Sequence, residues 1–423
     1  MKNAVKWSSL ALAVAAGNGM LASSAMAEGE GFVEGASATL YNRTVYFNRD
    51  FRDPGQGQSK ADETATSFLM NFESGYTQGP IGFGADVVAM MGVKLDSGRG
   101  RSGTRLLPVR EDGSAPPEYS EIRGAVKMAV LDDTVLRYGV HFPENPVAAY
   151  DDARLLPNHY EGYSITNNSI DGLFVEAGRL TDRSEMNGSG ETDGAVLPDE
   201  DLTFVGGTYA FTDNLSTTLY GAKSEDSYNR GFFGLDWTLP LNEGLSLNTN
   251  VAYYDTSDEQ SGDTEFDNQA GSLAFTLNAG HHAFGVAYQQ MEGDGRYEYR
   301  DGDIFIANSV QYLDFNAKDE KSYQARYDYD FEGLGIPGLS FMTRYIAGSD
   351  IDTAYETAYN GGTTVSRDSR WERDSELQYT VQNGTLEGLN IRWRNATIRQ
   401  DAAIDGGDVD ENRLIVGYTW NLL

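Results

Sequence analysis

The chain of 423 residues contains no cysteine. Disulfide bridges, thiolate metal sites and cysteine nucleophiles are therefore excluded, and the absence suits a protein that passes through an oxidising compartment. Basic residues are also scarce, because 32 lysines and arginines stand against 64 acidic residues. This balance argues against nucleic acid as a partner.

Long apolar runs are missing except near the N-terminus, where Lys2 and Lys6 precede an apolar run over residues 7–16. Small residues follow at 25–27, and the order of charge, apolar core and small residues predicts a secretory signal peptide cut after Ala27. A short N-terminal helix of the mature fold is the alternative. The predicted mature chain, residues 28–423, keeps 30 basic residues against 64 acidic ones, a formal charge of −34.

No mature stretch has the 18 or more apolar residues of a membrane helix. A mean hydropathy of −0.47, with 48 glycines and 25 tyrosines, fits a soluble secreted β protein of one or two domains. It fits a bacterial outer-membrane barrel equally well, because only alternate strand residues of such a barrel face lipid.

Apolar residues recur with a period of two along the mature chain. In residues 81–95, Phe83 and Val87 share one face, and Asp86 and Lys94 lie on the other. This alternation predicts strands, but a soluble sandwich of two sheets alternates in the same way.

The lengths of the connections favour the barrel, because short turns alternate with long polar loops at 96–120, 142–158, 182–200, 290–320 and 348–372. We predict a single domain that is a closed all-β antiparallel barrel, with both termini on the short-turn side and the long loops outside the cell. Closure is expected because an open edge in lipid would leave backbone groups without hydrogen bonds. The eighteen predicted strands lie near 32–48, 65–77, 81–95, 121–131, 134–141, 159–167, 172–181, 201–212, 215–225, 228–240, 245–255, 268–278, 282–290, 321–331, 339–347, 373–382, 388–399 and 412–423.

Two further expectations follow from the barrel. Aromatic residues at strand ends should form interfacial girdles, namely Trp237, Tyr253, Tyr329, Trp393 and Trp420. The terminal strand should pair with the first strand near residues 38–46, and an amphipathic strand at this place is the usual signal to the barrel assembly machinery.

Arginines recur on the polar faces of the last strands, at Arg326, Arg344, Arg392, Arg394 and Arg413. If the apolar faces meet lipid, these side chains line the lumen and form an anion path through an acidic protein. A guanidinium suits a carboxylate because it stays charged and presents a planar fork of donors. The alternative is that the arginines pair with lumenal acids such as Asp328 and hold the wall.

Several stretches resemble the OprD family of substrate-specific outer-membrane channels. They are YFNRD (46–50), ESGYTQGPIGFG (73–84), ARLLP (153–157), DIFIANSVQYLDF (303–315), QARYD (324–328), IPGLSFMTRYIAGSDID (336–352) and RLIV (413–416). The resemblance implies an eighteen-stranded barrel with one pore per chain, narrowed by inward-folded loops, which admits small carboxylate-bearing nutrients along a ladder of basic side chains.

The resemblance also implies particular site residues. The ladder falls on Arg154, Arg392, Arg394 and Arg413, and a polar pocket opposite it falls on Ser309, Tyr312 and Asp314. The chain departs from the family at Gln378, where the basic amino-acid channels tend to carry lysine, so one rung is absent.

The segments RYGVHFPENPVAAYDDARLLP (137–157) and LTDRSEMN (180–187) are more similar to the branch of the family that takes aromatic and other cyclic carboxylates. A basic amino-acid or peptide channel of the same family is one alternative. A general or structural barrel with adhesive loops is another. No cofactor, metal or catalytic residue is expected, and the chain is expected to work as a monomer or a loose trimer in contact with outer-membrane lipid and lipopolysaccharide.

Other signals are weaker. His281 and His282 could form a metal pair, but they are interpreted as turn residues, and His141 alone is a poor basis for a barrel phospholipase, which needs a serine and a histidine on the outer face. The cluster Arg99, Arg101 and Arg105 is interpreted as a solvated loop, with anion capture at the mouth as the alternative. The acidic run 255–267 lacks a calcium-loop pattern and is interpreted as a loop tip that divalent cations bridge to surface lipid.

Overall fold

The computed structural model describes residues 31–53, 57–131, 133–189, 201–225, 227–258, 267–404 and 407–423. The predicted signal peptide with its cleavage site, and most of the acidic run 255–267, lie outside the described residues. The strands are β1 (Ser37–Phe51), β2 (Lys60–Glu73), β3 (Ile81–Asp96), β4 (Glu118–Val130), β5 (Thr134–His141), β6 (Glu144–Asn145), β7 (Ala148–Ala149), β8 (His159–Ile170), β9 (Leu173–Ser184), β10 (Leu202–Thr212), β11 (Leu215–Ser224), β12 (Tyr228–Asn242), β13 (Leu245–Asp258), β14 (Asn268–Ala279), β15 (His282–Gly293), β16 (Lys321–Asp330), β17 (Leu339–Ser349), β18 (Arg370–Thr380), β19 (Asn390–Arg399) and β20 (Val409–Asn421).

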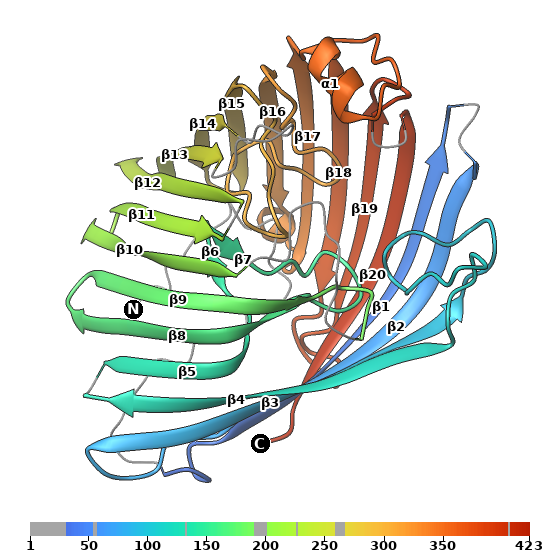
Figure 1. The fold of residues 1–423 in the computed structure, drawn as a ribbon. Helices are drawn as coiled ribbons and strands as arrows, with labels where there is room; N and C mark the ends of the chain where they lie inside the picture. The colour runs from blue at the N-terminus through green and yellow to red at the C-terminus, as the bar shows by residue number, and fades with distance from the viewer. Residues whose placement is uncertain are drawn as a thin grey trace.

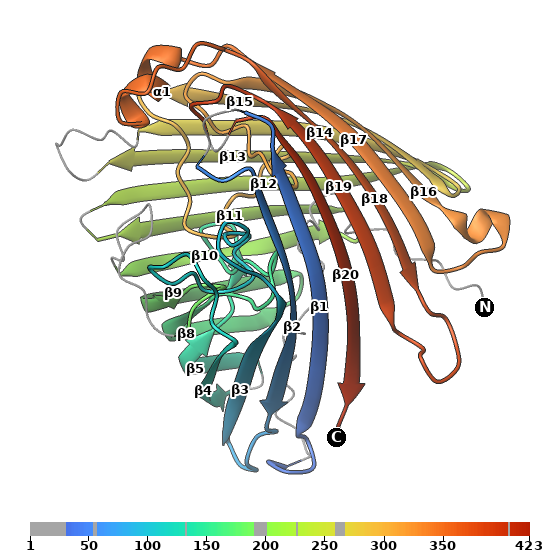
Figure 2. The same cartoon turned by 90° about the vertical axis from the view of Figure 1, so that its right-hand side faces the viewer.

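Eighteen of these strands form one closed antiparallel barrel (Figures 1 and 2). Each strand pairs with its neighbour along the chain, and β6 and β7 form a separate small hairpin inside a loop. The last strand pairs with the first, from Thr39 opposite Asn421 to Phe51 opposite Val409. The predicted fold class, strand number and closure are confirmed.

The two faces of each strand meet different surroundings. On β20, Leu414 and Trp420 are 43% and 42% exposed on the outer face, whereas Arg413 is 2% exposed on the inner face. Of the predicted girdle residues, Trp237, Tyr253, Trp393 and Trp420 are exposed outside, and Tyr329 is half-buried.

Glycine closes several of the tight turns between strands. Gly280 and Gly384 have φ angles of 61° and 86°, a left-handed conformation that side chains with a Cβ rarely adopt. Both glycines fall in turns that the sequence predicts.

Strand boundaries differ from the prediction by a few residues at several ends. β1 begins at Ser37 instead of residue 32, and β18 begins at Arg370 instead of residue 373. The turn after β16 contains a short 3-10 helix, η1 (Phe331–Leu334), and the long loop after β17 contains one helical segment, α1 (Thr353–Tyr359). Among the described residues, no helix is long and apolar enough to span a membrane.

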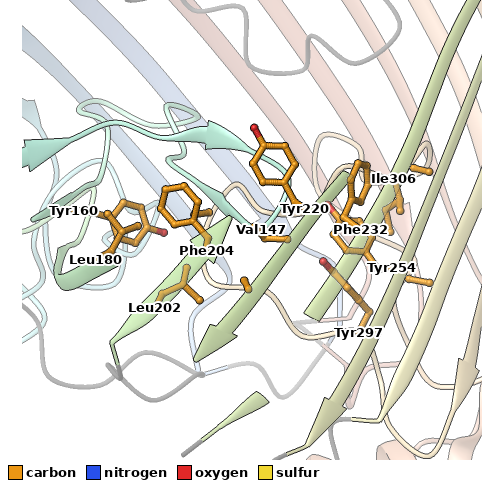
Figure 3. Close-up of a cluster of buried hydrophobic side chains, with 14 of the residues drawn as sticks. Val147, Tyr160, Leu180, Leu202, Phe204, Tyr220, Phe232, Tyr254, Tyr297 and Ile306 are labelled. Atoms are coloured by element: carbon orange, nitrogen blue, oxygen red, sulfur yellow. The ribbon is translucent and has the colours of Figure 1, made fainter. Parts of the chain in front are cut away.

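Three long loops fold into the barrel. Leu106 and Leu107 of the loop after β3 pack with Leu155 and Leu156 of the loop after β5, against inward side chains of β1 to β5. In the third loop, which follows β15, Tyr297 and Ile306 pack against β12, β13 and β14, and Figure 3 shows this cluster.

The segment 290–320, interpreted from its polarity as external, is therefore largely internal. The physical reason is that apolar side chains are spaced among the polar residues of this segment, so its average polarity does not reveal them. The buried apolar residues are Tyr297, Ile306, Val310, Leu313 and Phe315.

Candidate solute pathway

Two of the inward loops meet inside the barrel. The backbone N–H of Gly302, in the loop after β15, donates to the carbonyl of Ala149 on β7 at 3.1 Å. The Tyr254 hydroxyl on β13 donates to the carbonyl of Pro146 at 2.8 Å, and Val147 joins Ile306 in one buried cluster (Figure 3). These contacts bridge the loops after β5 and β15, so the lumen is narrowed at their level.

The tip of the loop after β15 is fastened to the opposite wall by buried carboxylates. Glu372 on β18 accepts from the backbone N–H groups of Tyr312 and Leu313 at 2.9 and 2.7 Å. Glu411 on β20 accepts from the amide of Gln311 at 3.0 Å. The loop tip is held on β18 and β20, next to the strands that carry the arginines.

Arg413 on β20 touches both loops. Its guanidinium donates to the carbonyls of Ala153 at 3.4 Å and Gln311 at 3.3 Å, and its Nε lies 2.6 Å from Glu411 Oε1. The other oxygen of Glu411 accepts from Arg49 of β1 at 2.8 Å. Arg413 therefore joins the wall to both inward loops, and it shares one carboxylate with Arg49.

The other strand arginines also have acidic partners, with Arg392 as the exception. The shortest nitrogen–oxygen distances are 2.8 Å for Arg326 to Asp328, 2.7 Å for Arg344 to Asp374 and 3.0 Å for Arg394 to Glu376. Of the six predicted arginines, four thus stand in ion pairs with lumenal acids, as the alternative interpretation expects.

Arg154 and Arg392 differ from the rest. Within the described part of the chain, neither has a carboxylate oxygen within 4.0 Å. Arg154 donates only to the carbonyls of Thr104 at 3.2 Å and Ala153 at 3.1 Å, and Arg392 Nε is buried without a hydrogen-bond partner. Burial and the positive charges of Arg413 and Arg49 lower the pKa of Arg154, which indicates positive charge in excess at this place.

The register of the sheet explains why Arg392 is unpaired. Arg394 lies opposite Glu376 on β18, whereas Arg392 lies opposite Gln378. Arg392 interacts electrostatically with Asp152, in the loop after β5. Burial raises the pKa of the Asp152 carboxyl, and the positive charges of Arg43 and Arg392 oppose this rise. The neutral Gln378 thus gives Arg392 no charged partner across the strands.

Comparison with known proteins decides the family. A family model described as outer membrane porin, OprD family, matches residues 30–422. The chain belongs to the OprD family of outer-membrane porins.

The similarity extends over whole chains. Porin D of Pseudomonas aeruginosa is 39% identical over 446 residues, which cover 99% of both chains. A BenF-like porin from Pseudomonas fluorescens superposes with a TM-score of 0.86 at 35% identity, covering 93% of this porin and all of that chain. The structure of Pseudomonas aeruginosa OpdK with vanillate gives a TM-score of 0.83 at 33% identity, covering 92% of this porin and all of that chain.

Two residues of the predicted polar pocket are in contact. Ser309 donates to Asp314 at 2.7 Å, and the Tyr299 hydroxyl also donates to Asp314. The ring centroid of the third predicted residue, Tyr312, lies 4.8 Å from the guanidinium carbon of Arg49.

Several charged residues of the porin lumen are absent from the sequence prediction. Arg43 and Arg49 lie on the inner face of β1, where Arg43 pairs with Asp152 and Arg49 with Glu411. Strand alternation could have identified both residues, because each lies an odd number of positions from the outward-facing Tyr46 and therefore on the inner face of the first strand. Their acidic partners are 109 and 362 residues away. Asp152 lies in an inward-folded loop and Glu411 lies opposite Arg49 in the strand register, so the sequence alone could not assign them.

The weaker sequence signals have ordinary contacts. His141 lies on the inner side of the barrel, 2.9 Å from the Ser164 hydroxyl and 2.7 Å from the Gly139 carbonyl. In the loop after β3, Arg99, Arg101 and Arg105 each pair with an acid, respectively Asp112, Asp96 and Glu185.

Proposed function

We propose that this porin mediates passive, selective diffusion of small organic carboxylates, with aromatic or cyclic carboxylates favoured, along its lumenal arginines. Arg154 and Arg392 are the rungs that take the carboxylate. Arg413, Arg394, Arg344 and Arg326 shape the potential around them.

One observation carries the proposal: two arginines at the narrowed part of the lumen have no carboxylate partner among the described residues, although the porin as a whole is acidic. A guanidinium with open donors binds a planar carboxylate through two hydrogen bonds. Their neighbours Arg413 and Arg394 are already paired with acids. The solute therefore meets two free guanidinium groups instead of four, and the attraction is weaker. Binding that stays weak is what allows release on the far side.

The aromatic surroundings support a cyclic solute. Phe47 lies under both Arg154 and Arg413, with ring centroids 5.5 and 4.3 Å from their guanidinium carbons, and Tyr312 lies against Arg49. A ring attached to a carboxylate can pack against these faces while its charge meets an arginine. The relatives described as BenF-like and as solved with vanillate point in the same direction.

The test is liposome swelling with the mature porin and a panel of benzoate-like acids, short aliphatic acids and arginine. We expect the fastest swelling with the benzoate-like acids. R154Q and R392Q should each slow benzoate about tenfold, since a charge-assisted hydrogen bond is worth roughly 1.5–3 kcal/mol. R99Q is the control, because Arg99 is an exposed loop arginine paired with Asp112 and is not one of the proposed pathway residues, and it should change the rate little.

Other outcomes would contradict the proposal. A preference for arginine would favour a basic amino-acid channel, and equal rates for all solutes would favour a general or structural barrel with adhesive loops. Benzoate flux that is unchanged in R154Q and R392Q would remove the two residues from the pathway.

Maturation and assembly belong to the same proposal. The chain would be exported through the periplasm, cut after Ala27 and inserted by the barrel assembly machinery, and its lipid neighbours would include lipopolysaccharide. N-terminal sequencing of the porin from purified outer membranes checks the cleavage, and native mass spectrometry distinguishes a monomer from a loose trimer.

A further inference from the structure

Arg373 lies on the outer face of β18, at the fourth residue from the end that meets the long loop. Its chain neighbours Glu372 and Asp374 are fully buried on the inner side, whereas Leu377 and Tyr379, which share its face, are 40% and 38% exposed. The Arg373 guanidinium therefore points toward the lipid. Its hydrogen bond goes to the Thr397 hydroxyl at 3.1 Å, and no carboxylate in the described part of the chain pairs with it.

The neighbours of Arg373 place it at the interfacial depth. Tyr345, its register partner on β17, is 47% exposed, and its ring lies 5.6 Å from that of Trp371. Exposed tyrosine and tryptophan mark the level where headgroups meet acyl chains. An arginine facing lipid at this level is tolerated at little cost and signals an anionic partner.

A second cation flanks the same spot. Arg399 lies opposite Trp371 in the register of β18 and β19, with its guanidinium carbon 5.8 Å from the Trp371 ring centroid, and it shares the outer face with Thr397. Arg399 is paired with Asp410 at 3.0 Å. β17, β18 and β19 lie side by side in Figure 2, so the group forms one outward patch on neighbouring strands.

We propose that this patch, Arg373, Thr397, Arg399, Tyr345 and Trp371, holds the phosphate of an anionic outer-leaflet lipid. The planar fork of Arg373 matches two phosphate oxygens. Arg399 is already paired with Asp410 and packs against the Trp371 ring at the edge of the patch. The aromatic rings pack against the lipid below its headgroup. Inorganic phosphate has the same oxygens, but it offers nothing for the rings and would not concentrate at a lipid-facing surface.

The other side of the barrel provides a contrast. Arg179 on β9 also lies on an outer face, but its guanidinium is engaged by Asp201 at 2.6 Å and Glu225 at 2.9 Å. The two outward arginines differ in whether a carboxylate already occupies them, which makes Arg179 the matched control for Arg373.

The test is native mass spectrometry of the mature porin in detergent, titrated with bisphosphorylated lipid A, the same lipid with its phosphates removed, and inorganic phosphate. We expect the porin to retain the phosphorylated lipid, with R373Q needing about tenfold more lipid for half occupancy. R179Q should bind like the unmodified porin. T397V, which removes only the hydroxyl, should weaken retention by a few-fold and provides a second variant if R373Q fails to fold, as judged by its gel mobility before and after heating.

Three results would overturn the proposal. Equal retention of the lipid without phosphates would mean that the headgroup is not recognised. Unchanged retention in both folded variants would mean that the patch is not the site. Displacement of the lipid by inorganic phosphate at the same concentration would make the patch a general anion site.

Discussion

The lumenal arginines divide into two groups that look alike in sequence. Arg326, Arg344, Arg394 and Arg413 are each paired with an acid of the wall, whereas Arg154 and Arg392 have none among the described residues. The first group neutralises carboxylates that the barrel has taken out of water, and the second leaves donors for a solute. A row of arginines is therefore not a uniform ladder, and the partner on the neighbouring strand decides what each rung does.

The largest expected effect comes from breaking a pair in the first group. R344A leaves the fully buried Asp374 without its cation, and an uncompensated buried charge costs roughly 3–5 kcal/mol. Urea unfolding of the folded porin in detergent should show a loss of this size. The double variant R344M/D374L, which removes both charges, should recover most of it, and an equally unstable double variant would mean that the pair is not what stabilises this part of the wall.

The next effect comes from moving Arg392 into the paired group. Q378E puts a carboxylate opposite Arg392 in the strand register, as Glu376 stands opposite Arg394. Benzoate flux in liposome swelling should fall about tenfold, since roughly 1.5–3 kcal/mol of attraction is redirected to the new acid. Q378L controls for the change of side chain and should leave the flux near its starting value. A Q378E porin with normal benzoate flux would break the distinction between the two groups.

The reverse change should have a smaller effect. E376Q frees Arg394 from a partly exposed ion pair, which is worth roughly 0.2–1 kcal/mol. We expect about a threefold increase in benzoate flux, and the increase should shrink as salt is raised because the newly exposed charge is screened. D328N is the matched control, because it removes the acid from a second arginine, Arg326, in the same way. The register partner of Arg326 is another arginine, Arg344. A larger gain in D328N than in E376Q would place the main attraction nearer to Arg326.

The sequence predicts the barrel well because strand alternation and connection length are local properties. All eighteen strands, the closing pair and the inner faces of Arg326, Arg344, Arg394 and Arg413 follow from them. The pairing state of each arginine does not, because Arg394 meets Glu376 and Arg49 meets Glu411 only through register across strands. The position of Arg154 depends on a loop that folds inward on apolar contacts made by Leu155 and Leu156, which no period along the chain reveals.

A last prediction concerns a buried carboxyl beside one of the lumenal arginines, whose charge depends on pH. Arg183 on β9 pairs with Asp301, in the loop after β15, at 3.1 Å, and Tyr160 donates to the same carboxyl at 2.8 Å; Arg300 and Asp303 lie beside it in the loop. Burial raises the pKa of Asp301 from 3.8 to about 7, against the opposing effect of Arg183.

Between pH 4 and 7 the folded porin therefore holds a proton at Asp301 that the unfolded chain has released. This contribution stabilises the fold at acid pH and is lost as the pH rises through about 7. The free energy of unfolding in urea should accordingly show a downward component over this range, which D301N removes because the amide does not titrate. Below pH 7 Arg183 also loses the negative charge of Asp301 and keeps that of Glu185, 3.4 Å away. Anion selectivity measured as a reversal potential should therefore rise slightly in the unmodified porin and stay level in D301N. A pH profile of unfolding that is the same in both would mean that Asp301 stays charged throughout this range.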